Sequence, residues 1–594
     1  MKRTKTALSL RTAALLLALL MLMQVLTACQ IGNIIDQVTS ESTTSAETLF
    51  ETTSPDGETT GGETTADTTV SDATTSDGSS SYEPIKYKIS HPELVYTYTT
   101  EKEAALTAAI ASLKETTVNG TIAESEYVAL YESVEAMVYE LQKEYQIAQV
   151  ETYLYKNNTE VNDRFLHISD FYNVELQKFI VLYRTIEQSQ YKDVFFAEWP
   201  EEEIVEALAL ADNYDEATAE LQSKIDELTL EQRDLPSDKY DEESVRIYRE
   251  VLKLNTQLAQ NLGYAGYMEY AYDSVYTRDY GPDEAATIEK YAKELLSPMI
   301  STLMSRLNRV NRALTNDDVS VLRKILNGSF EDSSNMALLK EFYASLGGDI
   351  NQAFLDFLDH GYYYIGYDSY ESEAGAFTFY ISELGVPVMY FGPGYHNIFT
   401  FVHEFGHYYS NIKSTEESLS FDLAETQSQG DEWLFLAFLK TKVTENAANY
   451  LIYYNAVNAM LTVMIALTVN HFETLCYADG AAGADTLDFD QLYKDACNTI
   501  YTYDEMKSLM GSNPEEYWRK VVIENPGYYI SYAISLIPSI ELYAFAVQDY
   551  AGAVAMYEAI QGNKSTFCET LVAAGLYSPF DDEAYALIVQ VFKK

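Results

Sequence analysis

The spacing of apolar residues along the chain predicts a mostly helical protein with one small sheet. From about Glu101 to Asn351, apolar residues recur at helical intervals in long charged stretches such as EAALTAAIASLKE. The window from about Tyr362 to Phe391 differs, because AFTFYI and VPVMYF have the pattern of two short strands joined by SELG. Helical patterning resumes at Asn397 and continues to the C-terminus. We therefore expect a mainly α fold whose small sheet lies just before residue 397.

The first residues have the pattern of an export signal. Basic residues precede an unbroken apolar run, Ala13 to Met23, which is too short for a comfortable membrane span. The run ends in LTAC, which resembles the lipobox of bacterial lipoproteins. This resemblance implies cleavage before Cys29 and a lipid anchor on its thiol, with an ordinary signal peptide or a single anchor helix as alternatives. We expect no later stretch to be long and apolar enough to cross a bilayer.

The segment after the cysteine has the composition of a tether. Residues 39–81 consist mainly of Ser, Thr, Gly and acidic residues, which offer almost nothing to bury. The remaining chain is long enough for two or more lobes. The predicted organisation is a signal peptide (1–28), a lipidated cysteine with a disordered tether (29–85), an N-terminal helical region (86–350) and a catalytic region (351–594), the last two forming one unit.

The net charge of the protein argues against anionic binding partners. The net charge is −52, from 91 acidic and 39 basic residues. Such a surface repels nucleic acid and anionic lipid, so we expect neither to bind. Beyond Cys29 the chain has three cysteines, Cys476, Cys497 and Cys568, which form no disulfide framework or zinc finger, although one bridge is open to them.

The stretch IFTFVHEFGHYYS carries the clearest chemical signal. On a helix, His403 and His407 share a face, so both imidazoles can bind one metal ion, and Glu404 can reach a water on that ion. Zinc needs a third protein ligand, which in one large class of zinc peptidases is a glutamate on the next helix; Glu425, 18 residues beyond His407, has a suitable position. On the same helix Gln429, Glu432 and Ser428 are candidate partners that orient the ligands. The alternative is a helix with two core histidines, and the surrounding pattern favours one bound Zn²⁺.

With its surroundings, the motif resembles the thimet oligopeptidase and oligoendopeptidase F family. FVHEFGHYYS followed by LAETQSQGDEW is similar to the zinc helix and glutamate helix of that family, and GAFTFYISELGVPVMYF is similar to its edge strand. The stretch LAQNLGYAGYMEYAYDSVYTRDYGPDEA resembles a helical segment of the family, so the likeness covers about Leu258 to the C-terminus. It implies a two-lobed, largely helical body with a deep channel for short, unstructured peptides.

The resemblance also extends to a tyrosine pair. NPGYYISYAISL is similar to the C-terminal segment of the family in which two tyrosines face the zinc, and Tyr529 and Tyr532 are the matching positions. Their hydroxyls are expected to stabilise the oxyanion or to bind the substrate backbone. Without the resemblance, the sequence pattern would indicate two core tyrosines. Family members often carry a histidine before this pair, and this chain has none after His471; Lys520 or Arg519 is a candidate substitute.

These parts predict a zinc peptidase. Glu404 is expected to act as general base, while the strand near Gly375 and Ala376 pairs with a short peptide substrate by adding a strand to the sheet. The predicted location is the outer face of a bacterial membrane, through the lipid anchor. Two alternatives remain open: a dipeptidyl carboxypeptidase of related fold, and a lipid-anchored peptide-binding protein without hydrolytic activity.

Overall fold

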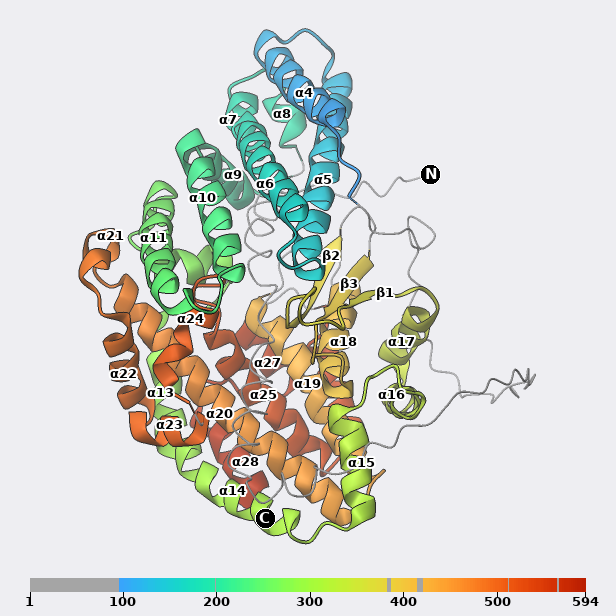
Figure 1. Ribbon diagram of the computed structural model, residues 1–594. Coiled ribbons are helices and arrows are strands. Elements are labelled where there is room, and N and C mark those ends of the chain that lie inside the picture. Colours follow the sequence, from blue (N-terminus) through green and yellow to red (C-terminus); the bar gives the residue numbers. More distant parts are fainter. Residues whose placement is uncertain are drawn as a thin grey trace, which may run out of the picture.

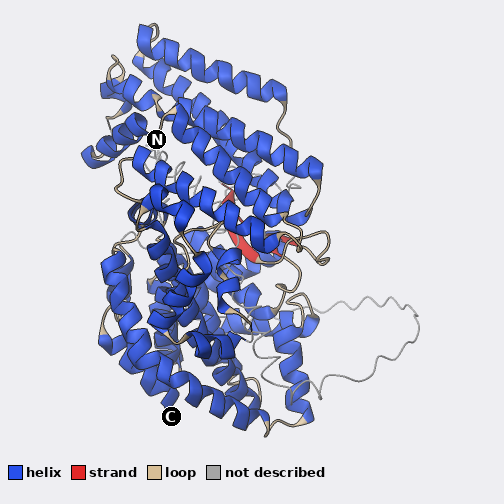
Figure 2. Ribbon diagram, turned by 60° about the vertical axis from the view of Figure 1, so that its left-hand side comes forward, coloured by secondary structure: helices blue, strands red, loops and turns tan. Residues whose placement is uncertain are grey.

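The computed structural model describes residues 96–593, except 198, 382–385, 414–419, 511 and 563–565. Helices make up most of this chain, and one small sheet lies among them (Figure 1, Figure 2). The predicted mainly α architecture is therefore confirmed. The predicted signal peptide, the lipidated Cys29 and the tether lie outside the described residues.

The first helices form the upper part of the molecule in Figure 1. Polar side chains fix several of their starts, since Thr99, Asn158 and Asp215 each accept a hydrogen bond from a backbone N–H of the first turn. These helices are α4 (Thr100–Asn119), α5 (Glu124–Leu154), α6 (Thr159–Ile180), α7 (Leu182–Glu187), α8 (Lys192–Phe195), α9 (Glu201–Asn213), α10 (Glu216–Arg233) and α11 (Tyr240–Asn261).

The lower part begins with helices that precede the sheet in the chain. Two of them continue as short π-helical turns, η2 (Ala271–Val275) and η3 (Ala292–Leu296). The helices are α12 (Tyr267–Tyr270), α13 (Pro282–Tyr291), α14 (Ser297–Asn311), α15 (Asn316–Asn327), α16 (Ser333–Leu346) and α17 (Gly348–His360).

The helices that follow the sheet complete the lower part and its core. Helix α14 packs along α20, and α19 packs along α25, so early and late parts of the chain share one core. Short 3₁₀ turns, η4 (Ala484–Thr486) and η5 (Pro514–Glu516), lie between some of them. The helices are α18 (Ile398–Lys413), α19 (Phe421–Leu439), α20 (Glu445–Tyr477), α21 (Gly480–Gly483), α22 (Phe489–Ile500), α23 (Tyr503–Met510), α24 (Trp518–Val521), α25 (Ile530–Ala546), α26 (Tyr550–Ala559), α27 (Phe567–Ala574) and α28 (Asp582–Lys593).

Helix α20 corrects one sequence expectation. We expected no segment after the signal to be long and apolar enough to cross a membrane, but α20 meets that condition by length and composition. Its most apolar 18-residue window is 78% buried inside the protein. Because a helix surrounded by other helices is apolar on every side, this composition fits a central core helix. Cys476, at its end, Cys497 and Cys568 are all free thiols.

The sheet has three strands, β1 (Tyr362–Ile365), β2 (Ala376–Ile381) and β3 (Val386–Phe391). Their order is β1-β3-β2, with β1 parallel and β2 antiparallel to β3. The two predicted strands are present, and β1 is an addition. Along β2, Phe377 and Phe379 face the end of α5, whereas Thr378 faces α18 on the other side. The sheet is therefore held between an upper and a lower helix, with β2 as an outer strand beside α18 (Figure 1).

Candidate metal centre

Three predicted metal ligands converge between α18 and α19. Asn397 caps α18 by accepting hydrogen bonds from the N–H groups of residues 399 and 400, as expected. One turn apart on this helix, His403 and His407 direct their rings toward Glu425 near the start of α19. The distances are 3.6 Å from His403 Nε2 to Glu425 Oε2 and 3.7 Å from His407 Nε2 to Glu425 Oε1. One ligand atom from each residue lies within 4.8 Å of the others, so the three can hold a single ion.

The electrostatics of these residues suit a divalent cation. Burial raises the pKa of the Glu425 carboxyl to about 7, although His403 and Tyr528 oppose that shift. Burial, and then the neighbouring His403, lowers the pKa of His407 well below its usual value, so its imidazole is neutral and offers a lone pair. Two imidazole nitrogens and one carboxylate are a donor set that zinc accepts while keeping a position open for water. The residues present fit the predicted zinc.

One of the three predicted orienting residues contacts a histidine. Glu432 Oε1 lies 2.7 Å from His403 Nδ1, which fixes the ring with Nε2 toward Glu425. Ser428 instead donates to the Glu425 backbone oxygen at 3.1 Å and to its carboxylate at 3.4 Å. Gln429 accepts a hydrogen bond from Ser535 of α25 and so connects two helices.

A glycine lets the two ligand helices approach closely. A Cβ atom on Gly406 would lie 2.6 Å from the Cα atom of Ser428 and 3.1 Å from the backbone oxygen of Gln427. These are backbone atoms of α19, which cannot swing aside as a side chain can. Glycine between the two histidines therefore sets the separation of α18 and α19, and with it the distance from the histidines to Glu425.

Glu404, the predicted general base, is held by the sheet. It is fully buried, and Thr378 of β2 donates a hydrogen bond to its Oε2 at 2.7 Å and to its backbone oxygen at 3.0 Å. The outer strand of the sheet is thus tied directly to this carboxylate. Gly375 and Ala376, the predicted substrate-binding pair, come at the beginning of the same strand. Gly375 has φ +137°, and nothing lies within 4 Å of the position that a Cβ atom would take.

A tyrosine that sequence reasoning did not choose also contacts one of the ligands. Tyr528 donates a hydrogen bond to Glu425 Oε1. Tyr529 is buried and interacts with Tyr517, and burial together with Tyr517 raises its pKa well above the usual value. The ring of Tyr532 lies against those of Tyr528 and Tyr529, with centroids 5.3 and 5.5 Å apart. The stretch NPGYYISYAISL therefore contributes Tyr528 as a partner of a ligand, and the roles of Tyr529 and Tyr532 stay predictions.

Buried polar groups hold the segment before Tyr528 in place. Tyr267 and Tyr276 donate to the backbone oxygen of residue 526 at 3.2 and 2.9 Å, and Glu473 accepts from the N–H of Gly527 at 2.7 Å. Gly527 has φ +82°, a conformation that favours glycine. Both tyrosines come from the stretch YMEYAYDSVY, so that helical segment acts by positioning Tyr528.

Removing the Tyr528 hydroxyl tests this arrangement. We expect Tyr528→Phe to weaken zinc binding about 10- to 100-fold, because Glu425 loses the hydrogen bond that orients it. Competition with a metal indicator gives the affinity. Tyr529→Phe is the matched control, since its hydroxyl faces Tyr517, and should bind zinc as the wild type does. A Tyr528→Phe variant that binds zinc with wild-type affinity would show that Tyr528 does not support the ligand Glu425.

Solved structures share this architecture. No protein-family model and no curated protein matches the sequence. A structure of PZ peptidase A with an inhibitor superposes with a TM-score of 0.64 at 17% identity, covering 84% of this chain and 98% of that one. A protein described as an oligoendopeptidase F from Bacillus anthracis str. Ames gives 0.64 at 16%, covering 86% and 98%. The oligoendopeptidase F of Enterococcus faecium gives 0.53 at 14%, covering 83% and 96%.

This chain has the oligoendopeptidase F fold. The fold expected from the resemblance is thereby confirmed over almost the whole length of each matched structure.

Proposed function

We propose that this chain is a zinc-dependent peptidase that hydrolyses short peptides. The observation that carries the proposal is the convergence of His403, His407 and Glu425 beside the buried Glu404. The oligoendopeptidase F fold supports it, because the matched structures include proteins named as peptidases. A binding protein without hydrolytic activity would not need the Glu404 carboxylate beside the three ligands.

Different residues of the chain are proposed to bind the metal, to transfer the proton and to position the ligands. His403, His407 and Glu425 would hold the zinc, which when bound lowers the pKa of a water and polarises the peptide carbonyl. Glu404, oriented by Thr378, accepts a proton from the attacking water and delivers it to the leaving amine. Tyr528 and Glu432 keep two of the ligands in position, and Tyr532 is the proposed hydroxyl donor to the oxyanion.

The substrate is proposed to extend along the outer edge of β2. Gly375 O accepts a hydrogen bond from the N–H of Gly392, so residues 375, 377 and 379 face β3 with their backbone groups. By alternation, Ala376 and Thr378 direct theirs to the outer edge, where an extended peptide can pair with them. Pairing through the backbone accepts varied side chains.

Export and anchoring complete the proposal. The apolar segment 13–23 and the LTAC sequence support a lipid-anchored protein on the outer face of a bacterial membrane. Short peptides outside the cell would then be its substrates.

Metal removal tests the proposed activity. We expect the full chain to cleave a set of synthetic peptides of graded length, to lose cleavage after treatment with a chelator, and to regain it with Zn²⁺. Mass spectrometry identifies the products. A chelated protein that keeps its turnover would contradict a metal-dependent reaction, and a zinc-loaded protein that binds peptides without cleaving any would support the binding protein instead.

A further inference from the structure

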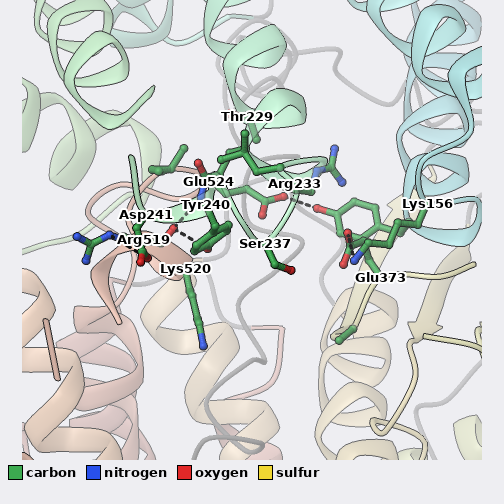
Figure 3. A pocket seen from close by; sticks show the side chains of 15 residues that line it. Lys156, Thr229, Arg233, Ser237, Tyr240, Asp241, Glu373, Arg519, Lys520 and Glu524 are labelled. Carbon is green, nitrogen blue, oxygen red and sulfur yellow. Dashed lines mark hydrogen bonds and ion pairs between the residues drawn. The ribbon is translucent and has the colours of Figure 1, made fainter. Parts of the chain in front are cut away.

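Charged side chains also gather outside the metal centre. One group lines a cavity of about 450 Å³ at the beginning of β2, where Figure 3 shows Lys156 beside Glu373 and Arg519 beside Asp241. Lys156 Nζ lies 2.9 Å from Glu373 Oε1 and Arg519 Nε lies 3.9 Å from Asp241 Oδ1, so these charges neutralise one another in the cavity wall. Another group surrounds Arg278, which is buried beside the turn that precedes α25.

The backbone before Arg278 has an unusual conformation. The element η2 is a π-helical turn, and Thr277 follows it with φ +48°, a left-handed conformation that a β-branched residue rarely adopts. The N–H of Arg278 then closes the turn by donating to the backbone oxygen of Tyr272 at 2.8 Å. Strain of this kind persists only where surrounding contacts hold it, and it is concentrated at functional sites. Here the strained residue comes immediately before a buried arginine.

The guanidinium of Arg278 joins two segments that carry parts of the metal centre. Its Nη2 atom donates to Ser531 Oγ at 2.9 Å and to the backbone oxygen of Tyr528 at 3.3 Å. Its Nε atom lies 3.6 Å from Oδ2 of Asp422, which belongs to the first turn of α19. Because Asp422 precedes the ligand Glu425 by about one helical turn, Arg278 connects the helix of the ligand to the turn of the tyrosine that holds it.

Aromatic rings hold the guanidinium itself in place. It lies over the rings of Tyr272 and Tyr276, 4.4 and 4.7 Å from their centroids. Burial opposes the charge of Arg278, but Tyr280 and Asp422 raise its pKa above the usual value, so the side chain stays cationic. The charge of Arg278, its orientation and its acceptors are therefore fixed together.

Stability alone does not account for this pair of charges. The side chains of Arg278 and Asp422 are both fully buried. Taking two charges out of water is costly, and replacing a buried ion pair with uncharged side chains of similar volume is often neutral or stabilising. Uncharged side chains would not supply a rigid planar donor that reaches acceptors on two helices at once. The pair therefore suits a place where the relative position of two segments matters.

We infer that Arg278 is a positioning residue of the metal centre. It fixes the turn that carries Tyr528 against the first turn of α19, so that the Tyr528 hydroxyl meets Glu425. This inference rests on the proposed zinc centre and deepens it, because it names a residue well over 100 positions before the ligands that sets zinc affinity.

Zinc affinity in a double-mutant cycle, measured on the full chain by competition with a metal indicator, tests the inference. The paired variant Arg278→Met/Asp422→Asn removes both charges and leaves neither unpaired, so we expect a folded protein whose Kd for zinc is about 10- to 100-fold higher. In a Tyr528→Phe background the same pair should raise the Kd little further, because the hydroxyl that Arg278 positions is already gone. A merely structural role would give equal losses in both backgrounds.

Bound Co²⁺ gives a second readout, because its visible absorption depends on the geometry of the ligands. The paired variant and Tyr528→Phe should change this spectrum in the same way. Arg249→Met is the matched control, since Arg249 of α11 also lies over an aromatic ring and donates to backbone oxygens, those of residues 484 and 487. It should keep the wild-type Kd and spectrum.

Ser531→Ala decides the matter where the paired variant fails to fold, because it removes only one acceptor of Arg278. It should weaken zinc binding to a smaller extent, and only while Tyr528 keeps its hydroxyl. Wild-type zinc affinity in the folded paired variant or, where that variant does not fold, in Ser531→Ala would overturn the inference and leave the zinc peptidase intact, as would equal losses in both backgrounds. A wild-type chain that binds no zinc would overturn both.

Discussion

The Glu404→Gln variant is expected to bind zinc normally and to lose peptide hydrolysis. Glutamine has nearly the same shape as glutamate, and its amide oxygen can still accept the hydrogen bond that Thr378 donates. It cannot take a proton from water, so the kcat should fall by about 10²- to 10⁴-fold. The comparison uses the same peptide set, with metal content measured on the same samples.

Two further measurements separate chemistry from structure. The melting temperature and zinc stoichiometry of Glu404→Gln should match the wild type, because Glu404 is not one of the three ligands. Glu227→Gln, at an exposed position on α10, is a control for an unrelated carboxylate and should keep full activity. Substantial turnover in zinc-loaded Glu404→Gln would assign the proton transfer to another group.

Gly406→Ala is expected to damage both stability and metal binding. Its methyl group would lie 2.6 Å from the Cα atom of Ser428, so α18 and α19 must move apart. Overpacking of this kind costs about 1–3 kcal/mol of the free energy of unfolding. The same movement separates His403 and His407 from Glu425, so zinc affinity should fall as well.

Urea unfolding of the metal-free protein and a chelator competition measure these two losses independently. Gly266→Ala is the matched control, because Gly266 has extended backbone and no atom lies within 4 Å of the added Cβ. It should unfold and bind zinc as the wild type does. A Gly406→Ala protein with unchanged stability and affinity would show that the interhelical distance does not depend on this glycine.

The ligand set could be predicted because it depends on local geometry. His403 and His407 follow from the helical repeat, and Glu425 lies on the next helix of the chain. Glu432 could be placed by the same reasoning, since the periodicity of α19 turns its side chain toward the histidines.

The contact between Tyr528 and Glu425 could not be predicted in this way. Tyr529 and Tyr532 were predicted from the resemblance to a family segment, and their roles stay predictions, whereas Tyr528 precedes α25, which begins at Ile530. Tyr528 lies in the preceding turn, whose direction is set by the left-handed backbone of Gly527 and by contacts with Tyr267, Tyr276 and Glu473. These contacts join residues more than 50 positions apart, so no local pattern reports them.

The same limit applies to β1 and to α20. Strand β1 exists because Tyr362–Ile365 pairs in parallel with β3, and parallel pairing joins segments that are not consecutive. Helix α20 has the composition of a membrane span, and only the helices packed around it show that it belongs to the core.

The hydrogen bond from Tyr528 to Glu425 joins residues 103 positions apart. During synthesis of the chain, Glu425 is therefore made well before the tyrosine that holds it. At a synthesis rate of about 5–20 residues per second, Tyr528 emerges roughly 5–20 s after Glu425. Until then α19 also lacks α25, the helix along which it packs. A growing chain therefore carries its histidines and glutamate before Tyr528 and α25 exist, and the centre is completed only once α25, which ends at Ala546, has been added.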